Sequence, residues 1–290
     1  MAFGTKLELW LPDRESLWGR RLKWLPERIR DIPIRVPEGF SFASLEGCSS
    51  LPGPLLSIQQ RRWPRVFGTA PYQDVFSMLT QNPDAPCALR VHIKRNHDVK
   101  YCIVINRDTT PVAVARRVIW LSRRFAFHDM LRVTPACQGG GLGSQLLANA
   151  IPLYRLLKIE GIRLNAGLTA GGAVWPKYGF HPINAEAWRQ THAQILRNLR
   201  DLDSSVQIAC LPIFSGPLSQ VIESIMSSGD PKAIWNISDL DARVPSVPPD
   251  GHGLGSYLLS KTRWKGILRF DDQACYRRLA AYLHKKGLHI

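Results

Sequence analysis

The stretch that decides the fold is Gln138-Gly139-Gly140-Gly141-Leu142-Gly143-Ser144. Residues 125–133 before it are rich in the apolar and aromatic side chains of a strand, and residues 143–158 after it repeat apolar side chains at helical spacing. A glycine-rich turn at this junction exposes free backbone N–H groups at the positive end of a helix dipole. Glycine also permits positive φ and close approach of a ligand. The stretch predicts a phosphate or pyrophosphate site, with a plain strand-to-helix connection as the alternative.

Two common nucleotide-binding motifs do not fit this loop. The dinucleotide fingerprint needs an acidic residue about 20 residues after G-x-G-x-x-G, at the end of the next strand. Here Glu160 precedes that strand. The kinase-type motif needs Gly-Lys-Ser/Thr, and Gly143-Ser144 lacks the lysine. These departures argue against a nucleoside triphosphate site.

A second motif follows the helix. Residues 162–168 are typical of a strand, and the chain continues into Trp175-Pro176-Lys177-Tyr178-Gly179-Phe180. Together with Gln-x-x-Gly-x-Gly at 138–143, this ending resembles the GNAT-type N-acetyltransferase superfamily over roughly residues 111–185. The resemblance implies an α/β (α+β) fold, in which helices flank a central mixed, mostly antiparallel sheet. It also implies acetyl-coenzyme A, or another acyl-coenzyme A, and direct attack of an amine on the thioester.

The resemblance assigns cofactor contacts to particular residues. The backbone amides of the glycine loop would hold the pyrophosphate, with Gln138 shaping the loop. The strand ending at Val133 would bond the pantetheine arm and diverge from the strand at 162–168, leaving a wedge. Asn165 would bridge a pantetheine amide or satisfy a neighbouring backbone group. The predicted cofactor-binding residues are Val133, Gln138, Gly139, Gly140, Gly141, Leu142, Gly143, Ser144 and Asn165.

The catalytic residues are less regular. Many family members carry a Tyr four residues before the Gly of the Gly-Phe pair, where it protonates the leaving thiolate, but Trp175 occupies that position here. Tyr178 is the best acid by its chemistry, although α-helical geometry would turn it roughly 300° from Trp175. A tyrosine packed beneath the sheet is the alternative. The amine must lose a proton, and His128 and Asp129 are candidate bases, of which a strand presents only one to the substrate. Both are equally explained as polar residues at a strand edge.

A second, looser resemblance concerns biological setting. Acetyltransferase-like modules of bacterial secreted effectors and mobile elements share a His-Asp pair before the loop, here His128-Asp129. They also share a Tyr-Arg pair late in the following helix, here Tyr154-Arg155. This similarity implies a role as a bacterial effector or toxin.

Charge is the strongest compositional feature. The 290 residues carry a formal net charge of +15 at pH 7, more than an anionic cofactor alone would require. Such an excess steers a protein toward nucleic acid, an acidic protein or an anionic surface, although solubility alone is an alternative explanation. The sequence therefore predicts an amine acceptor on a protein or on an RNA-linked aminoacyl group, and leaves the oligomeric state open.

The cysteines and the apolar segments bear on location. None of the six cysteines forms a CxxC pair or has zinc-finger spacing to histidine, which favours free thiols in a reducing compartment and predicts no metal site. There is neither a run of 18 apolar residues nor a Sec-type signal. These features predict a cytoplasmic protein, with export by a signal-peptide-independent route left open.

The chain divides into three predicted regions. Residues 1–84 form a basic extension rich in Trp and Pro, residues 85–215 the acyltransferase core, and residues 216–290 a mainly helical extension. The predicted function is that of an acyl-coenzyme A-dependent N-acetyltransferase. The alternative is a non-catalytic module of the same fold that binds nucleic acid or a protein partner, which Trp175 at the acid position favours.

Overall fold

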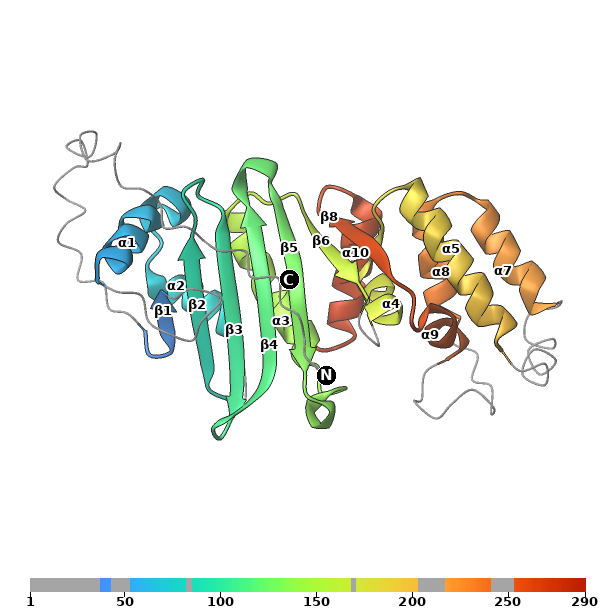
Figure 1. Ribbon diagram of the computed structural model, residues 1–290, viewed down its shortest axis with the longest axis horizontal. Coiled ribbons are helices and arrows are strands. Elements are labelled where there is room, and N and C mark those ends of the chain that lie inside the picture. The colour runs from blue at the N-terminus through green and yellow to red at the C-terminus, as the bar shows by residue number, and fades with distance from the viewer. Residues whose placement is uncertain (1–36, 43–52, 82–84, 168–170, 203–216, 241–252) are drawn as a thin grey trace, which may run out of the picture.

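A computed structural model describes residues 37–42, 53–81, 85–167, 171–202, 217–240 and 253–290. In these residues an eight-stranded mixed sheet has the order β1-β2-β3-β4-β5-β6-β8-β7 (Figure 1). The strands are β1 (Phe40–Phe42), β2 (Cys87–Ile93), β3 (Val99–Arg107), β4 (Thr110–Trp120), β5 (Phe125–Val133), β6 (Gly161–Ala166), β7 (His181–Pro182) and β8 (Trp264–Arg269). The predicted fold class, a mostly antiparallel sheet flanked by helices, is confirmed.

The centre of the sheet is an antiparallel meander of β2 to β5. Alternating burial along β2 shows the period of a strand with one face on the core. Tyr101, Arg117 and His128 are register partners across β3, β4 and β5, so their side chains share one face of the sheet. On that face Tyr101 and His128 both contact Tyr154 of the helix that follows β5.

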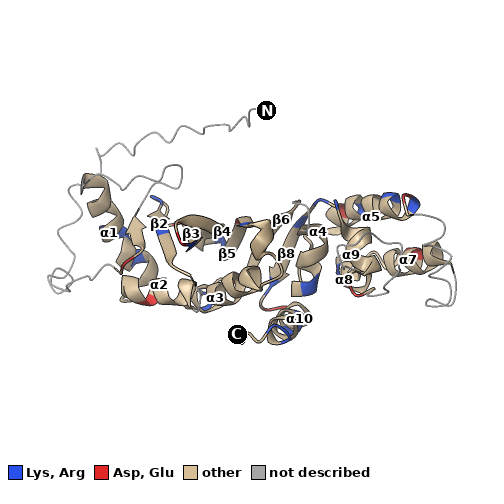
Figure 2. Ribbon diagram, turned by 90° about the horizontal axis from the view of Figure 1, so that it is seen from below, with Lys and Arg blue, Asp and Glu red and all other residues tan. Residues whose placement is uncertain are grey.

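Helices cover this face. Figure 2 shows α2 (Tyr72–Thr80), α3 (Leu142–Leu156) and α10 (Gln273–His284) on the same side of the strands. Helix α3 buries Leu147, Ile151 and Tyr154. Its Asn149 donates to the carbonyls of Leu79 and Gln81, which joins it to α2.

Part of the predicted N-terminal extension belongs to this fold. Strand β1 pairs in parallel with β2, and α1 (Gly53–Phe67) donates from Gln59 to the carbonyl of Ile93 at 3.1 Å. An aromatic cluster fills the space between them, with ring centroids no more than 5.9 Å apart in each contact. Its members are Phe40, Phe42, Trp63, Phe67 and Tyr72.

The predicted C-terminal extension also contributes to the sheet. Strand β8 lies between β6 and β7 and pairs along all six residues of β6. The described α-helices between β7 and β8 are α5 (Ala185–Arg200), α7 (Leu218–Ser227), α8 (Ile234–Ser238) and α9 (Leu254–Leu259). The boundaries at 84 and 215 stay predictions, and the structure adds that the sheet uses residues from both sides of them.

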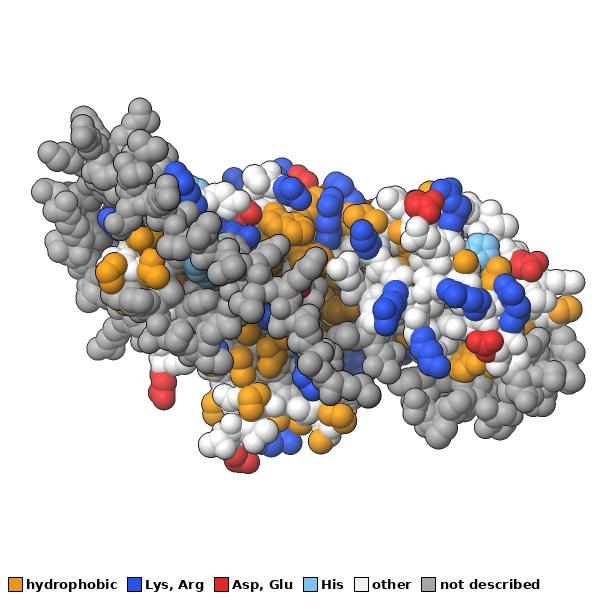
Figure 3. All heavy atoms as spheres, viewed as in Figure 1, with side chains coloured by type: hydrophobic (Ala, Val, Ile, Leu, Met, Phe, Trp, Pro, Cys, Tyr) orange, Lys and Arg blue, Asp and Glu red, His pale blue; other side chains and the backbone are white. Residues whose placement is uncertain are grey.

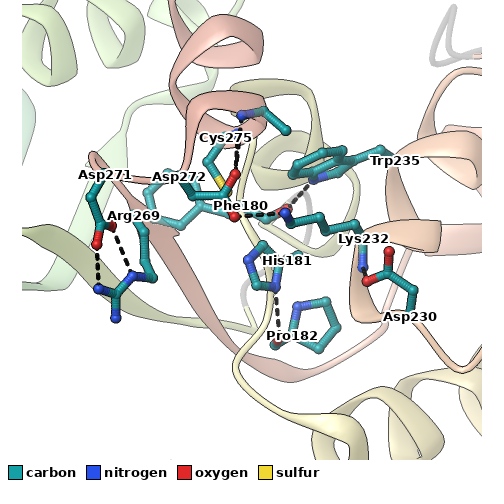
Figure 4. A network of polar contacts seen from close by, with 11 residues as sticks. Phe180, His181, Pro182, Asp230, Lys232, Trp235, Arg269, Asp271, Asp272 and Cys275 are labelled. Carbon is teal, nitrogen blue, oxygen red and sulfur yellow. Dashed lines mark hydrogen bonds and ion pairs between the residues drawn. The ribbon is translucent and has the colours of Figure 1, made fainter.

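Polar contacts tie these helices to α10 and β7 (Figure 4). Lys232 forms an ion pair with Asp272 at 2.6 Å, and Trp235 Nε1 donates to the carbonyl of Phe180 at 2.9 Å. Arg278 of α10 bonds the carboxylate of Asp239. The segment around α8 is therefore held against α10 and the residue that precedes β7.

No helix in the described ranges is long and apolar enough to cross a membrane. Cys87, Cys102, Cys137 and Cys275 are free thiols.

Candidate active site

The candidate site lies where β5 and β6 separate. These parallel strands pair only from Phe125 with Gly161 to His128 with Leu164. Strand β5 continues to Val133 and β6 to Ala166, so a wedge opens beyond the last pair. The predicted divergence of the two strands is confirmed, and His128 lies at its apex.

A β-bulge at the apex changes which side chains face α3. His128 pairs with Arg117 and Met130 pairs with Arg116, which leaves Asp129 as an extra residue in β5. His128 faces α3, where it bonds Tyr154, and Leu131 also faces α3. Without the bulge, residues three apart would point to opposite faces.

The glycine loop lies between β5 and α3. Gly139 has a φ of 80° and Gly141 a φ of 83°, and a Cβ at either position would meet nothing within 4 Å. Glycine is therefore required at both positions by the positive φ of the backbone, because a side chain would have room. Gln138 Nε2 donates to the carbonyl of Val133 at 3.0 Å, which fastens the loop to the end of β5.

Helix α3 presents unpaired donors at this loop. Gly141 is its N-cap, and the first intrahelical bond runs from Gln145 N to the carbonyl of Gly141 at 2.9 Å. The N–H groups of Leu142, Gly143 and Ser144 therefore have no acceptor within the helix. Open space over the glycines, free N–H groups and the helix dipole together fit a bound pyrophosphate.

The structure buries His128 in a hydrogen-bonded chain. Its Nε2 lies 2.8 Å from the hydroxyl of Tyr154, which lies 3.0 Å from the hydroxyl of Tyr101. Burial and, secondarily, the charge of Arg117 hold the pKa of His128 well below its ordinary value of 6.5. The imidazole is therefore neutral at physiological pH and a weak acceptor for a proton, and its role as a base stays a prediction.

Tyr178 lies at the start of α3. Its hydroxyl is 2.7 Å from Ser144 Oγ, in the first turn of the helix. Burial raises the pKa of Tyr178 to about 12, against a smaller lowering by the bond to Ser144. The phenol is therefore protonated at neutral pH. Tyr178, a predicted catalytic residue, and Ser144, a predicted cofactor-binding residue, are thus hydrogen-bonded to each other at the start of α3.

Residues 55–180 match the acetyltransferase (GNAT) family. The matched segment is similar to the GNAT family, over less than half of the 290 residues. A comparison with curated proteins found no match.

The solved structures that match include acetyltransferases. An IAA acetyltransferase from Bacillus cereus is 17% identical over 29% of this chain, with a TM-score of 0.26, and the match spans 57% of that protein's length. Tetrahymena GCN5 is 18% identical over 48% of this chain and 76% of its own, with a TM-score of 0.28. Nourseothricin acetyltransferase is 11% identical over 38% of this chain and 80% of its own, with a TM-score of 0.27.

The backbone around Trp175 differs from the helix expected from the sequence. Residues Trp175–Tyr178 form a 3-10 helix, not the α-helix assumed for the 300° estimate. Residues three apart eclipse in a 3-10 helix, so Tyr178 lies beside Trp175, with ring centroids 5.8 Å apart. The expected angular separation was therefore wrong.

Gly179 of the Gly-Phe motif has two reasons to be glycine. Its φ is 88°, and a Cβ there would lie 2.6 Å from the carbonyl of Cys275 in α10. The motif thus marks a turn against which the C-terminal helix packs.

Two other predicted residues lie apart from this cluster. Asp129 is exposed at the bulge and pairs with Arg116 at 3.4 Å, while His128 is buried. Asn165 is exposed on β6, where it is the register partner of Lys265. The structure therefore brings Tyr178 together with Ser144. The His128 ring lies 6.5 Å from that of Trp175, which in turn neighbours Tyr178.

Sequence reasoning did not assign roles to Tyr101 and Arg117. Tyr154 was singled out only as half of a Tyr-Arg pair. A buried arginine with a tyrosine partner in the next strand is visible in the sequence only once the strand register is known.

Proposed function

We propose that the protein is an acyl-coenzyme A-dependent N-acetyltransferase that acetylates an amine on a macromolecule. The observation that carries the proposal is the wedge between β5 and β6, with the donors of the glycine loop at its mouth. An anionic carrier bound at the loop can extend its acyl end along β5 toward the apex. There the ring of His128 lies 6.5 Å from that of Trp175, which lies 5.8 Å from that of Tyr178.

Acetyl-coenzyme A supplies an activated thioester when bound. The free N–H groups at the start of α3 would hold its pyrophosphate, and the edge of β5 near Val133 would align the pantetheine arm. The acceptor nitrogen forms a bond to the carbonyl carbon, the carbon–sulfur bond breaks, and the electron pair leaves with sulfur. The amine gives up one proton to water and the sulfur takes one up. Tyr178, being protonated at neutral pH, is the donor nearest the loop by its bond to Ser144.

A basic strip beside the wedge supports a macromolecular acceptor. Lys265 of β8 is the register partner of Asn165, and Arg263 packs 3.8 Å from the Cβ position of Gly167 at the end of β6. Helix α5 holds the adjoining loop, because Gln194 bonds the backbone of Arg263. The basic strip consists of Arg197, Arg200, Lys261, Arg263 and Lys265, all exposed and without an ion pair among the described residues.

Lys and Arg side chains gather over α5 and its surroundings on the face shown in Figure 3. Exposed cations with few acidic neighbours attract polyanions and accelerate their encounter. The strip would therefore align an anionic macromolecule whose amine enters the wedge. A role as a bacterial effector or toxin rests on the second resemblance and belongs to the same proposal.

The first test is calorimetric titration of the full chain with acetyl-coenzyme A and then with coenzyme A lacking the acyl group. We expect saturable binding of both. Labelled acetyl-coenzyme A added to a cell lysate with the protein should then label protein or RNA. Absence of cofactor binding would overturn the proposal.

The second test concerns the basic strip. The double variant Arg263→Glu/Lys265→Glu should lower the labelling rate at least tenfold and weaken its dependence on salt, because fewer phosphates or carboxylates are neutralised. The variant Lys285→Glu/Lys286→Glu makes the same charge change at the far end of α10 and should act like wild type. Equal loss in both pairs would show that only net charge matters.

The alternative is a non-catalytic module that binds nucleic acid. Trp175 at the usual acid position favours it, since an indole does not protonate a thiolate. Salt-sensitive RNA binding by the full chain, combined with no acetyl transfer to any lysate component, would support this alternative over the enzyme.

A further inference from the structure

A buried chain of three side chains leads to the apex of the wedge. Tyr101 of β3, Tyr154 of α3 and His128 of β5 are 1%, 0% and 4% exposed. Their polar atoms are joined by contacts of 3.0 and 2.8 Å, and the second of these ends on His128 Nε2. The other ring nitrogen, Nδ1, is buried and has no hydrogen-bond partner among the described residues.

A buried cation lies beside the two tyrosines. Arg117 is 2% exposed and donates to the carbonyls of Met130 at 2.6 Å and Arg116 at 2.9 Å. Burial raises the pKa of Tyr101 and Tyr154, and the Arg117 charge acts in the opposite direction on both. Arginine stays charged in proteins, so both hydroxyl oxygens lie in the field of a permanent cation.

The charge of Arg117 and the need to satisfy each hydroxyl proton favour one direction for the Tyr101–Tyr154 and Tyr154–His128 hydrogen bonds. If His128 Nε2–H donated to Tyr154, one hydroxyl proton would lack an acceptor in the chain: that of Tyr101 if Tyr154 donated to it, or that of Tyr154 if it accepted from both neighbours. In the opposite direction Tyr101 donates to Tyr154 and Tyr154 donates to Nε2. That arrangement gives both hydroxyl protons an acceptor and leaves the Tyr101 oxygen with free lone pairs in the field of Arg117.

The favoured direction fixes the histidine tautomer. Because Nε2 accepts a bond, the neutral ring carries its proton on Nδ1. Within the hydrogen-bonded chain of Tyr101, Tyr154 and His128, the one unsatisfied polar group is then a donor, Nδ1–H. It lies at the last register pair before β5 and β6 separate, on a ring whose other neighbour is Trp175. A buried unpartnered donor at the apex calls for an acceptor on the substrate.

We propose that His128 Nδ1–H donates a hydrogen bond to the thioester carbonyl oxygen, and that Tyr154, Tyr101 and Arg117 are positioning residues that fix this tautomer. This role rests on the proposed acetyltransferase function. When the amine nitrogen bonds to the carbonyl carbon, an electron pair moves onto that oxygen, and it returns as the carbon–sulfur bond breaks. No proton leaves His128. A preorganised donor of this kind stabilises the charge that develops in the transition state.

The tautomer is measurable in the free protein. Nitrogen-15 spectra of histidine-labelled full-length protein distinguish Nδ1–H from Nε2–H and from the imidazolium. We expect His128 to be neutral with Nδ1–H at pH 7, and the Tyr154→Phe variant to shift it toward Nε2–H. An Nε2–H or imidazolium form in the wild type would overturn the proposal.

Kinetics test the role itself. His128→Ala should lower kcat about 10²- to 10³-fold, as expected for loss of one such donor, with KM for acetyl-coenzyme A changed less than about threefold. His128→Asn places an amide N–H near the Nδ1 position and should recover at least tenfold of that loss. His128→Gln extends its amide toward the Nε2 position and should recover none. Tyr154→Phe should lower kcat about tenfold, the loss expected for a weakened orientation of the donor.

The outcomes separate this role from the proposed function. If the wild type transfers no acetyl group to any acceptor, both are overturned. If the wild type is active and His128→Ala retains full kcat, or His128→Gln recovers activity while His128→Asn does not, only the role of His128 is overturned. Circular dichroism of each variant identifies loss of activity caused by unfolding, and His128→Asn serves as the replacement closest in volume.

Discussion

Tyr178 combines a protonated hydroxyl with a fixed partner. Its bond to Ser144 holds the phenol at the first turn of α3, and its ring also contacts Tyr282 of α10 at 4.6 Å. The hydroxyl is thus kept in one place by elements on both sides. An acid needs its proton and a fixed position, and Tyr178 has both.

The Tyr178→Phe variant tests this role. Loss of the acid should lower kcat about 10²- to 10⁴-fold, the range for general acid–base groups. Ser144→Ala removes the partner and leaves the phenol protonated, because the bond to Ser144 lowers the pKa of Tyr178. It should therefore retain kcat within about tenfold. Steady-state kinetics measure kcat for both variants. A Tyr178→Phe variant with the kcat of wild type would show that the tyrosine serves packing alone.

His128 also makes stability depend on pH. Its pKa is lower in the folded protein than the ordinary 6.5, with burial as the main cause. The unfolded chain therefore binds more protons below about pH 6.5, and the free energy of unfolding falls as pH decreases through this window. The slope should approach about 1.4 kcal/mol per pH unit for this one group.

Denaturant unfolding between pH 5 and 8 measures that slope. His128→Asn should flatten it, because the replacement does not titrate. His181 is half-buried and also has a lowered pKa, mainly through burial, so His181→Asn is the comparison variant and should remove a separate part of the slope. An unchanged slope in the His128 variant would show that the histidine is protonated equally easily in both states.

The residue contacts at the site could not be predicted from sequence patterns. Ser144 and Tyr178 are 34 residues apart, and His128 and Tyr154 are 26 apart. Periodicity specifies which face of an element a side chain occupies, and it says nothing of which side chains on two packed elements meet. The bulge at Asp129 adds a further shift of face that alternation does not reveal.

At the scale of elements, the sequence predicted more. Strand β5 has the predicted bounds, and α3 and β6 lie within two residues of theirs, because apolar patterning marks these elements directly. Strand β8 was not predicted. Its residues Trp264 to Arg269 include two lysine or arginine side chains and a glycine, so its apolar pattern is short and interrupted.

The glycine loop gives a prediction at this scale. Gly141→Ala forces a side chain into a φ of 83°, which costs about 1–2 kcal/mol for non-glycine residues. Relief of that strain would turn the N–H groups of α3 away from the anion. The dissociation constant for acetyl-coenzyme A should rise about tenfold or more, since 1.4 kcal/mol corresponds to a factor of ten.

Gly140→Ala is the control for this loop. Gly140 has no positive φ, and its Cβ would lie 3.5 Å from the carbonyl of Cys137, an ordinary contact. Titration should show affinity close to wild type. Equal weakening by both variants would show that side-chain bulk near the ligand matters more than backbone conformation.

At the scale of the whole molecule, the sheet depends on residues distant in sequence. Strand β8 supplies the second neighbour of β6 and buries Trp264, Ile267 and Leu268. Helix α10 then packs on the 3-10 turn of Tyr178, where Arg278 donates to the carbonyl of Pro176 at 2.9 Å. The C-terminal residues therefore help to hold the candidate acid in place.

A fragment limited to residues 1–215, which keeps β1, α1 and α2, tests this dependence. It would lose β8, so the edge of β6 that pairs with β8 over six residues would be exposed. It would also lose the α10 contacts of Tyr178 and Gly179. An exposed ladder and its uncovered apolar side chains favour aggregation. We expect thermal denaturation, followed by circular dichroism, to be cooperative for the full chain and not for the fragment. A cooperative fragment that binds acetyl-coenzyme A would instead place the domain boundary at 215, because the core would then need neither β8 nor α10.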